Sequence, residues 1–254
     1  MEIMQRKSPH WLISAGLLCW IGLNLPVSQA DGGLSLSQTR VVFEGKAKSA
    51  KVALNNQSDR VYLINSRVLP TPDAVSQTGE IMPFMVTPPL FRLEKESRNT
   101  VLIAKNDTSK LPTDRESVFY LSFLAIPAVS NSTREVAADT DKSATTTQVS
   151  LGIRTVIKLF YRPSGLVMPA AAAPEKLTFS LQGTQLTVKN PTPYYVTLAQ
   201  LTLDDNTVNV REQGPMLAPF SENTYTVKGG RANRIDWSVI TDFGGVSELF
   251  HWSR

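Results

Sequence analysis

The feature that most constrains the fold is the alternation within residues 148–163, "QVSLGIRTVIKLFYRP". One face of this stretch carries Val149, Leu151, Ile153, Thr155, Ile157, Leu159 and Tyr161. An apolar residue at every second position predicts a β-strand with one buried face. A long polar run precedes the strand, so its N-terminal end has no apolar cover close by in the chain. We therefore predict a long strand in a β-rich domain, with one end left accessible.

A series of short segments rich in β-branched residues precedes this strand. They cover residues 34–43, 49–58, 60–69, 82–94, 99–105 and 117–128. Turn-forming residues separate them, and no helical period extends over several turns. Together with residues 148–163 they make seven short strands, which is typical of an immunoglobulin-like β-sandwich.

The polar run "SNSTREVAADTDKSATTT", residues 130–147, lacks aromatic side chains and is rich in Ser, Thr, Asp and Ala. Such a composition buries too little apolar surface to offset the entropy of ordering the chain. We predict a mobile loop inside the first domain, between its last two strands. A domain boundary is the alternative. The loop is favoured because the apolar face that follows needs a sheet, and the preceding strands offer one.

The composition changes after residue 163, where "PSGLVMPAAAAPEK" predicts a linker and the start of a new unit. Further β-type segments follow at 177–190, 194–203, 222–229, 233–240 and 247–253. The first of them reads as a hairpin with its turn at Gln182-Gly183. We therefore predict an all-β chain of two sandwich domains, residues 31–164 and 165–254.

The N-terminus has the features of an export signal. Arg6-Lys7 precede an apolar stretch at residues 11–25, and small residues at 28–30 suggest cleavage after Ala30. The apolar stretch is shorter than the roughly 18–20 residues of a membrane span, which makes a retained anchor the weaker alternative. We expect residues 1–30 to be removed and the rest of the chain to be exported.

Composition also excludes several kinds of chemistry. The single cysteine, Cys19, lies in the predicted signal, and His251 is the only histidine after it. Thiol nucleophiles, histidine triads and His/Cys metal sites are therefore not expected. The net charge of +4 is scattered rather than gathered in a patch, which argues against nucleic acid. No glycine-rich phosphate loop occurs. We predict no cofactor, no metal and no enzymatic activity.

Several motifs then occur in a specific order. They are "SLSQTRVVF", "VTPPLFRLE", "LPTDRESVFYL", "IRTVIKLFYRP", "NPTPYYVTL" and "ITDFGG". Together they resemble the periplasmic pilus chaperones of Gram-negative bacteria, the PapD-like family. The resemblance extends from residue 34 to residue 245, and "IKLFYRP" and "NPTPYYVT" are its most specific parts.

The resemblance implies two immunoglobulin-like domains arranged as a boomerang around a cleft. It implies that Arg40, in "QTRVVF", and Lys158, in "VIKLFYRP", bind the C-terminal carboxylate of a pilus subunit. It also implies that Val149, Leu151 and Ile153 lie on a donor strand that completes the subunit's own sheet. The expected function is a periplasmic chaperone that binds, folds and caps pilus subunits and delivers them for fimbrial assembly.

Many members of this family have an interdomain ion network of an Arg, a Glu and an Asp. Glu116 in "DRES" and Asp242 in "TDFGG" match the two carboxylates, whereas we place the arginine position at Leu102. Two buried carboxylates without a cation would be costly. We therefore expect that Arg98, Arg115 or another base replaces the arginine, or that the domain interface is organised differently.

The resemblance further implies an outer-membrane usher as a partner. The 130–147 loop has no cysteine pair and is similar to the short-loop branch of the family. An unoccupied donor strand is an open sheet edge, so we expect a transient homodimer when no subunit is bound. The alternatives from other classes are a structural or adhesive component of a surface fibre and, less favoured, a hydrolase with paired carboxylates.

Overall fold

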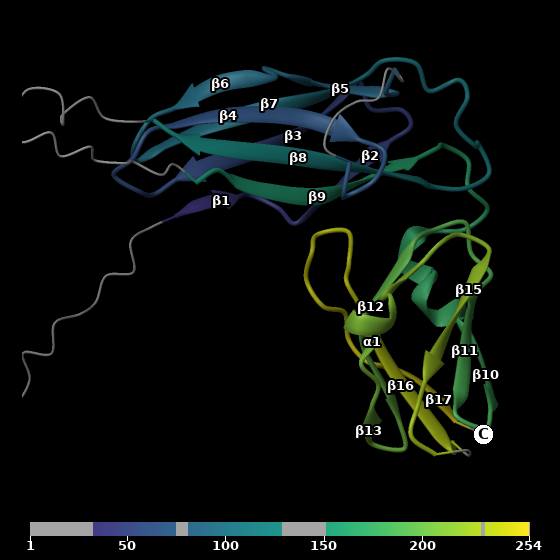
Figure 1. Cartoon of the computed structure of the whole chain (residues 1–254). Coiled ribbons are helices and arrows are strands. Elements are labelled where there is room, and N and C mark those ends of the chain that lie inside the picture. Colours follow the sequence, from purple (N-terminus) through teal and green to yellow (C-terminus); the bar gives the residue numbers. More distant parts are fainter. Residues whose placement is uncertain (1–32, 75–80, 129–150, 230–231, 254) are drawn as a thin grey trace, which may run out of the picture. The chain divides into compact units, whose positions relative to one another are not determined.

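The structure is a computed structural model that describes residues 33–74, 81–128, 151–229 and 232–253 (Figure 1). The predicted signal at 1–30, the predicted loop at 130–147 and Val149 lie outside these residues. No helix in the described part of the chain is long and apolar enough to cross a membrane. The described chain forms two β-sandwich domains, as predicted.

The first domain packs two sheets face to face. One sheet has the strand order β1-β3-β7-β5, and the other has the order β2-β9-β8-β4-β6. The strands are β1 (Leu34–Leu36), β2 (Arg40–Glu44), β3 (Ser49–Asn56), β4 (Tyr62–Leu69), β5 (Phe84–Thr87), β6 (Leu90–Leu93), β7 (Ser97–Lys105), β8 (Ser117–Pro127) and β9 (Ile153–Arg162).

The alternating apolar residues of these strands meet between the two sheets. Phe43, Ile64, Ile103, Leu121 and Leu159 have essentially no exposed surface. Because successive side chains of a strand point to opposite faces, the residues between them lie on the outer faces. From Ile157 onwards, the alternating apolar residues of 148–163 therefore face the core, as predicted.

Two predicted strands are each divided into two strands that join different sheets. Residues 34–43 form β1, which pairs with β3, and β2, which pairs with β9. Ser37 stands at the crossover, where its N–H donates to the Ala53 carbonyl at 2.9 Å. Residues 82–94 form β5 and β6 on either side of a cis Thr87–Pro88 bond. Pro88 and Pro89 have no N–H to donate, so a sheet ladder stops there.

The second domain also packs two sheets. Their orders are β10-β11-β15 and β13-β12-β16-β17, with β14 paired to β12. Its elements are η2 (Ala170–Ala172), η3 (Pro174–Lys176), β10 (Thr178–Gln182), β11 (Gln185–Asn190), β12 (Val196–Leu203), β13 (Asn206–Thr207), α1 (Val210–Gln213), β14 (Met216–Leu217), β15 (Ser221–Thr226), β16 (Arg234–Val239) and β17 (Phe250–Ser253).

The alanine and proline run, which we predicted as a linker and the start of a new unit, packs against the second domain. Its two short 3-10 turns bury Ala173 and Pro174. The Trp237 indole N–H donates to the Pro174 carbonyl at 3.1 Å. The predicted hairpin at 177–190 is confirmed as the β10–β11 pair, with Gly183 in the left-handed region at φ 57°.

Candidate functional site

The two cations predicted from the resemblance lie side by side on neighbouring strands. β2 runs parallel to β9, and Arg40 is the register partner of Lys158. An Arg40 Nη1 N–H donates to the carbonyl of Ile240, in the second domain, at 3.1 Å. The Arg40 guanidinium also lies over the Phe160 ring, 5.7 Å from its centroid. The sheet register therefore places both cations at one point, next to the second domain.

Both cations are half-buried and keep unused donors. Arg40 Nε is buried without a hydrogen-bond partner, and neither Arg40 nor Lys158 forms an ion pair within the described residues. Burial lowers the pKa of the Lys158 ammonium, and repulsion from Arg40 lowers it further. Burial also lowers the pKa of Arg40, although Asp242 and Glu116 act against it. Two desolvated cations with free donors form a site for an anion such as a carboxylate.

The N-terminal end of β9 is an open sheet edge. β8 pairs with residues 153–161 of β9, whereas β2 pairs only with 158–162 on its other side. Among the described strands, none pairs with the β2 side of 153–157. Leu151 and Ile153 are 76% and 57% exposed. Unpaired backbone groups beside exposed apolar side chains are the features to which another strand adds.

An apolar cavity of about 590 Å³ lies beside this edge. It is lined by β1 and β9, and the core residues Ile64 and Phe123 form part of its wall. Ile153 and Ile157 line it from the β9 side. The inner face of the sandwich is therefore accessible beside the same residues that form the open edge.

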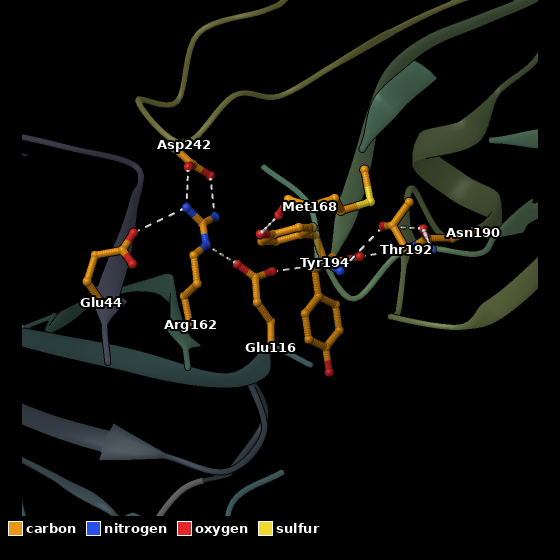
Figure 2. Close-up of polar contacts among 9 residues, drawn as sticks. Glu44, Glu116, Arg162, Met168, Asn190, Thr192, Tyr194 and Asp242 are labelled. Atoms are coloured by element: carbon orange, nitrogen blue, oxygen red, sulfur yellow. Dashed lines mark hydrogen bonds and ion pairs between the residues drawn. The ribbon is translucent and has the colours of Figure 1, made fainter. Parts of the chain in front are cut away.

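Arg162, at the end of β9, holds the two predicted interdomain carboxylates together (Figure 2). Its Nε donates to Glu116 at 2.8 Å, and its two terminal nitrogens donate to Asp242 at 2.8 and 3.0 Å. Glu44 accepts a longer bond of 3.3 Å. The second Glu116 oxygen accepts the backbone N–H of Tyr195 at 2.9 Å.

The placement of the network's arginine at Leu102 is wrong, whereas the expectation that another base supplies the cation agrees with the structure. Leu102 is on β7, in the sheet that does not contain β9, and Arg162 supplies the cation. Arg115, one of the proposed replacements, instead pairs with its neighbour Asp114. The strand pairing could have identified Arg162. It faces Glu44 across the same β2–β9 pair in which Arg40 faces Lys158.

Burial and the neighbouring charges have opposite effects on the pKa values of Arg162 and Glu116. Burial acts to lower the pKa of the Arg162 guanidinium, but its hydrogen bonds to Asp242 and its attraction to Glu116 outweigh burial and raise that pKa above its ordinary value. Burial raises the pKa of the Glu116 carboxyl, while Arg162 and the Tyr195 N–H act in the opposite direction. Arg162 therefore stays charged, and its charge and hydrogen bond favour the ionised form of Glu116.

The motif "NPTPYYVTL" forms the turn from which the backbone N–H of Tyr195 donates to Glu116. The Asn190 side chain donates to the Tyr194 carbonyl at 2.7 Å and accepts from the Thr192 hydroxyl at 2.7 Å. The Tyr194 ring lies 5.1 Å from the Arg162 guanidinium. The motif therefore shapes the second domain's side of the ion network.

His251 is bound in a separate ion cluster of the second domain. Its Nδ1 lies 2.5 Å from Asp236, which also accepts from Arg234 Nε at 2.7 Å. Within the described ranges, no three or more His, Cys, Asp or Glu residues are grouped so that they could hold a metal ion.

Comparison with known families covers both domains. Residues 33–167 match the family described as pili and flagellar-assembly chaperone, PapD N-terminal domain. Residues 172–251 match the family described as pili assembly chaperone PapD, C-terminal domain.

Individual relatives span nearly the whole chain. The probable fimbrial chaperone LpfB of Escherichia coli O157:H7 is 36% identical over 233 residues, which cover 90% of this chain and 93% of LpfB. The structure of the Salmonella enterica SafA pilin in complex with the SafB chaperone matches with a TM-score of 0.71 and 29% identity, covering 88% of this chain and 97% of that chain. The periplasmic chaperone SfaE matches with a TM-score of 0.66 and 30% identity, covering 86% and 98%.

Proposed function

Because the chain belongs to the PapD-like family of pili assembly chaperones, we propose that it is a periplasmic chaperone that binds, folds and caps pilus subunits and delivers them for fimbrial assembly. The observation that carries this proposal is the pair of half-buried cations, Arg40 and Lys158, beside the open edge of β9. An anion site at the end of an open strand edge suits a bound strand that ends in a carboxylate.

The cations set the position of the bound chain. A carboxylate on Arg40 and Lys158 accepts charge-assisted hydrogen bonds, and each is worth roughly 1.5–3 kcal/mol. Fixing the end of the chain also fixes the register of the residues before it. A slip of one residue would turn every side chain to the opposite face of the strand.

The open edge of β9 supplies most of the apolar contact. The subunit strand adds to this edge, and Val149, Leu151 and Ile153 enter the apolar core of the subunit. Complete burial of such a side chain is worth roughly 1.5–3 kcal/mol before the cost of association is subtracted. The exposure of Leu151 and Ile153 in the free chain supports this role.

The proposal is tested with a synthetic peptide copied from the C-terminal strand of a pilus subunit. Calorimetry compares the peptide bearing a free carboxylate with the same peptide bearing a C-terminal amide. We expect the amide to bind at least about tenfold more weakly, because it loses the attraction to two cations. Equal affinity of the two peptides would refute the anion site.

The variant Leu151→Asp tests the donor strand. We expect it to reduce recovery of a co-expressed pilus subunit by about tenfold or more, since a carboxylate would have to enter the apolar core of the subunit. Stability of the free chaperone should not change, because Leu151 is exposed. Val167→Asp is the matched control, at a residue that is 91% exposed and outside β9. If both variants retain the subunit equally, Leu151 is not on the donor strand.

We propose the finer assignments on the same basis. Residues 1–30 are an export signal, residues 31–164 and 165–254 are the two domains, and the 130–147 loop belongs to the short-loop branch. An outer-membrane usher receives the loaded chaperone. The role is not catalytic, and the open β9 edge pairs transiently with a second copy when no subunit is bound.

A structural or adhesive role in a surface fibre is the second candidate. The two-domain match to chaperones, with both domains covered, favours the chaperone. Glycan binding by the isolated chain would favour the adhesin instead.

A further inference from the structure

A tight turn in the second domain presents a phenylalanine that is almost completely exposed. We call residues 240–246 the Phe243 turn, and Phe243 itself is 96% exposed. The turn is closed by its own backbone. The Thr241 N–H donates to the Gly245 carbonyl at 2.8 Å, and the Gly244 N–H donates to the Thr241 carbonyl at 2.9 Å. Ile240 and Val246 form a β-bridge at its base.

Three contacts attach this turn to the first domain, next to the anion site of Arg40 and Lys158. Ile240 accepts the Arg40 hydrogen bond at 3.1 Å, and Asp242 pairs with Arg162 (Figure 2). Gly244 lies against Thr39, the residue before Arg40, so closely that a Cβ on Gly244 would collide with the Thr39 hydroxyl. Gly244 also has φ 84°, a conformation suited to glycine. The turn is therefore held in place beside the two cations.

The Phe243 side chain is exposed and lies outside both hydrophobic cores. Ile240 and Tyr195 line an apolar cavity of about 490 Å³ that Phe243 borders. Val246, in the turn, and Leu249, shortly after it, are also exposed. A group of large apolar side chains on a fixed turn is typical of an interaction surface.

We propose that the Phe243 turn is a second contact for the bound subunit, and that it packs against apolar side chains next to the subunit's C-terminal carboxylate. The inference rests on the proposed function. A subunit strand that ends at Arg40 and Lys158 has its last residues beside Ile240, because Arg40 is bonded to the Ile240 carbonyl. We assign this surface to the subunit because the turn is hydrogen-bonded directly to Arg40 of the anion site. The cations select the charge of the chain end, and Phe243 selects apolar residues beside it.

The test uses the full-length mature chaperone and the free-carboxylate subunit peptide, with calorimetry as the readout. We expect Phe243→Ser to weaken binding about tenfold, since burial of a phenylalanine on binding is worth about that factor or more. Phe243→Leu should recover most of the loss because it restores apolar area. Ile81→Ser is the matched control, at a residue that is 80% exposed on the first domain, and it should bind as wild type does.

The outcomes separate this inference from the proposed function. Wild-type affinity of Phe243→Ser together with loss of binding in Arg40→Ala overturns the inference and leaves the anion site standing. Unchanged affinity in both variants removes the proposed function and the inference with it. A change confined to self-association, seen by sedimentation without peptide, also overturns the inference, because it assigns the turn to a second copy. Thermal unfolding of Phe243→Ser should match wild type, since the side chain is exposed.

Discussion

Replacing Arg40 or Lys158 by alanine should reduce the affinity for a free-carboxylate subunit peptide by about ten- to a hundredfold, because each removes a charge-assisted hydrogen bond worth roughly 1.5–3 kcal/mol. The physical reason is the environment of the pair. Both side chains are half-buried, and neither has a carboxylate partner within the described residues. The bound carboxylate is then the group that compensates their desolvation. Calorimetry with the two variants measures the effect.

The amidated peptide is the control for this experiment. If the cations bind the carboxylate, alanine at Arg40 or Lys158 should weaken the amide far less than the free acid. The difference between the two losses is the coupling energy between the cation and the carboxylate. Equal losses with both peptides would mean that the cations support the fold of the cleft and do not bind the chain end.

The pH dependence of binding gives a further readout of Lys158. Burial and Arg40 lower the pKa of Lys158 in the free chain, and a bound carboxylate raises it again. The stabilisation of the complex is therefore complete at pH values below the lowered pKa of the free chain. It is lost as the pH rises above that value, beginning below the ordinary lysine value of about 10.4. Lys158→Arg should move this loss to higher pH, since arginine stays protonated.

The alternation in residues 148–163 predicted β9, and the seven strand-like segments together predicted the sandwich that contains it. The same pattern could not show that residues 34–43 and 82–94 change sheets. A strand that crosses from one sheet of a sandwich to the other still alternates between core and solvent. The crossovers depend on Ser37 and on the Thr87–Pro88–Pro89 segment, whose effect comes from backbone hydrogen bonds and not from hydropathy.

Site residues that lie in short motifs were predictable. Residues whose role depends on contacts between distant segments were not. Arg40 and Lys158 were located by motif, and in the structure they are register partners on β2 and β9. Arg162 was missed because its role depends on contacts with Glu116 and Asp242, which are far from it in the sequence. The Phe243 turn could not be predicted, since hydropathy alone assigns a phenylalanine to a core.

Arg162→Ala should lower the free energy of unfolding by about 3–5 kcal/mol, the usual cost of removing one partner from a buried ion pair. The Glu116 side chain is 2% exposed and would keep only the Tyr195 N–H as a partner. Asp242 is 44% exposed, so water can solvate it in place of Arg162. Urea denaturation followed by circular dichroism measures the loss. Arg92→Ala is the control, because its pair with Glu94 is exposed on both sides and should contribute little.

The pH dependence of Arg162→Ala identifies the unpaired charge as the cause. Without Arg162, burial should raise the pKa of Glu116 further above its unfolded value. A raised folded-state pKa stabilises the fold at pH values below the unfolded pKa of about 4.3, and this contribution is lost as the pH rises through the folded value. The deficit of Arg162→Ala should therefore be largest at neutral pH and smaller in acid. Glu116→Gln in the same background should remove that pH dependence and recover part of the stability. A deficit that is independent of pH would instead indicate lost packing of the Arg162 side chain on Tyr194.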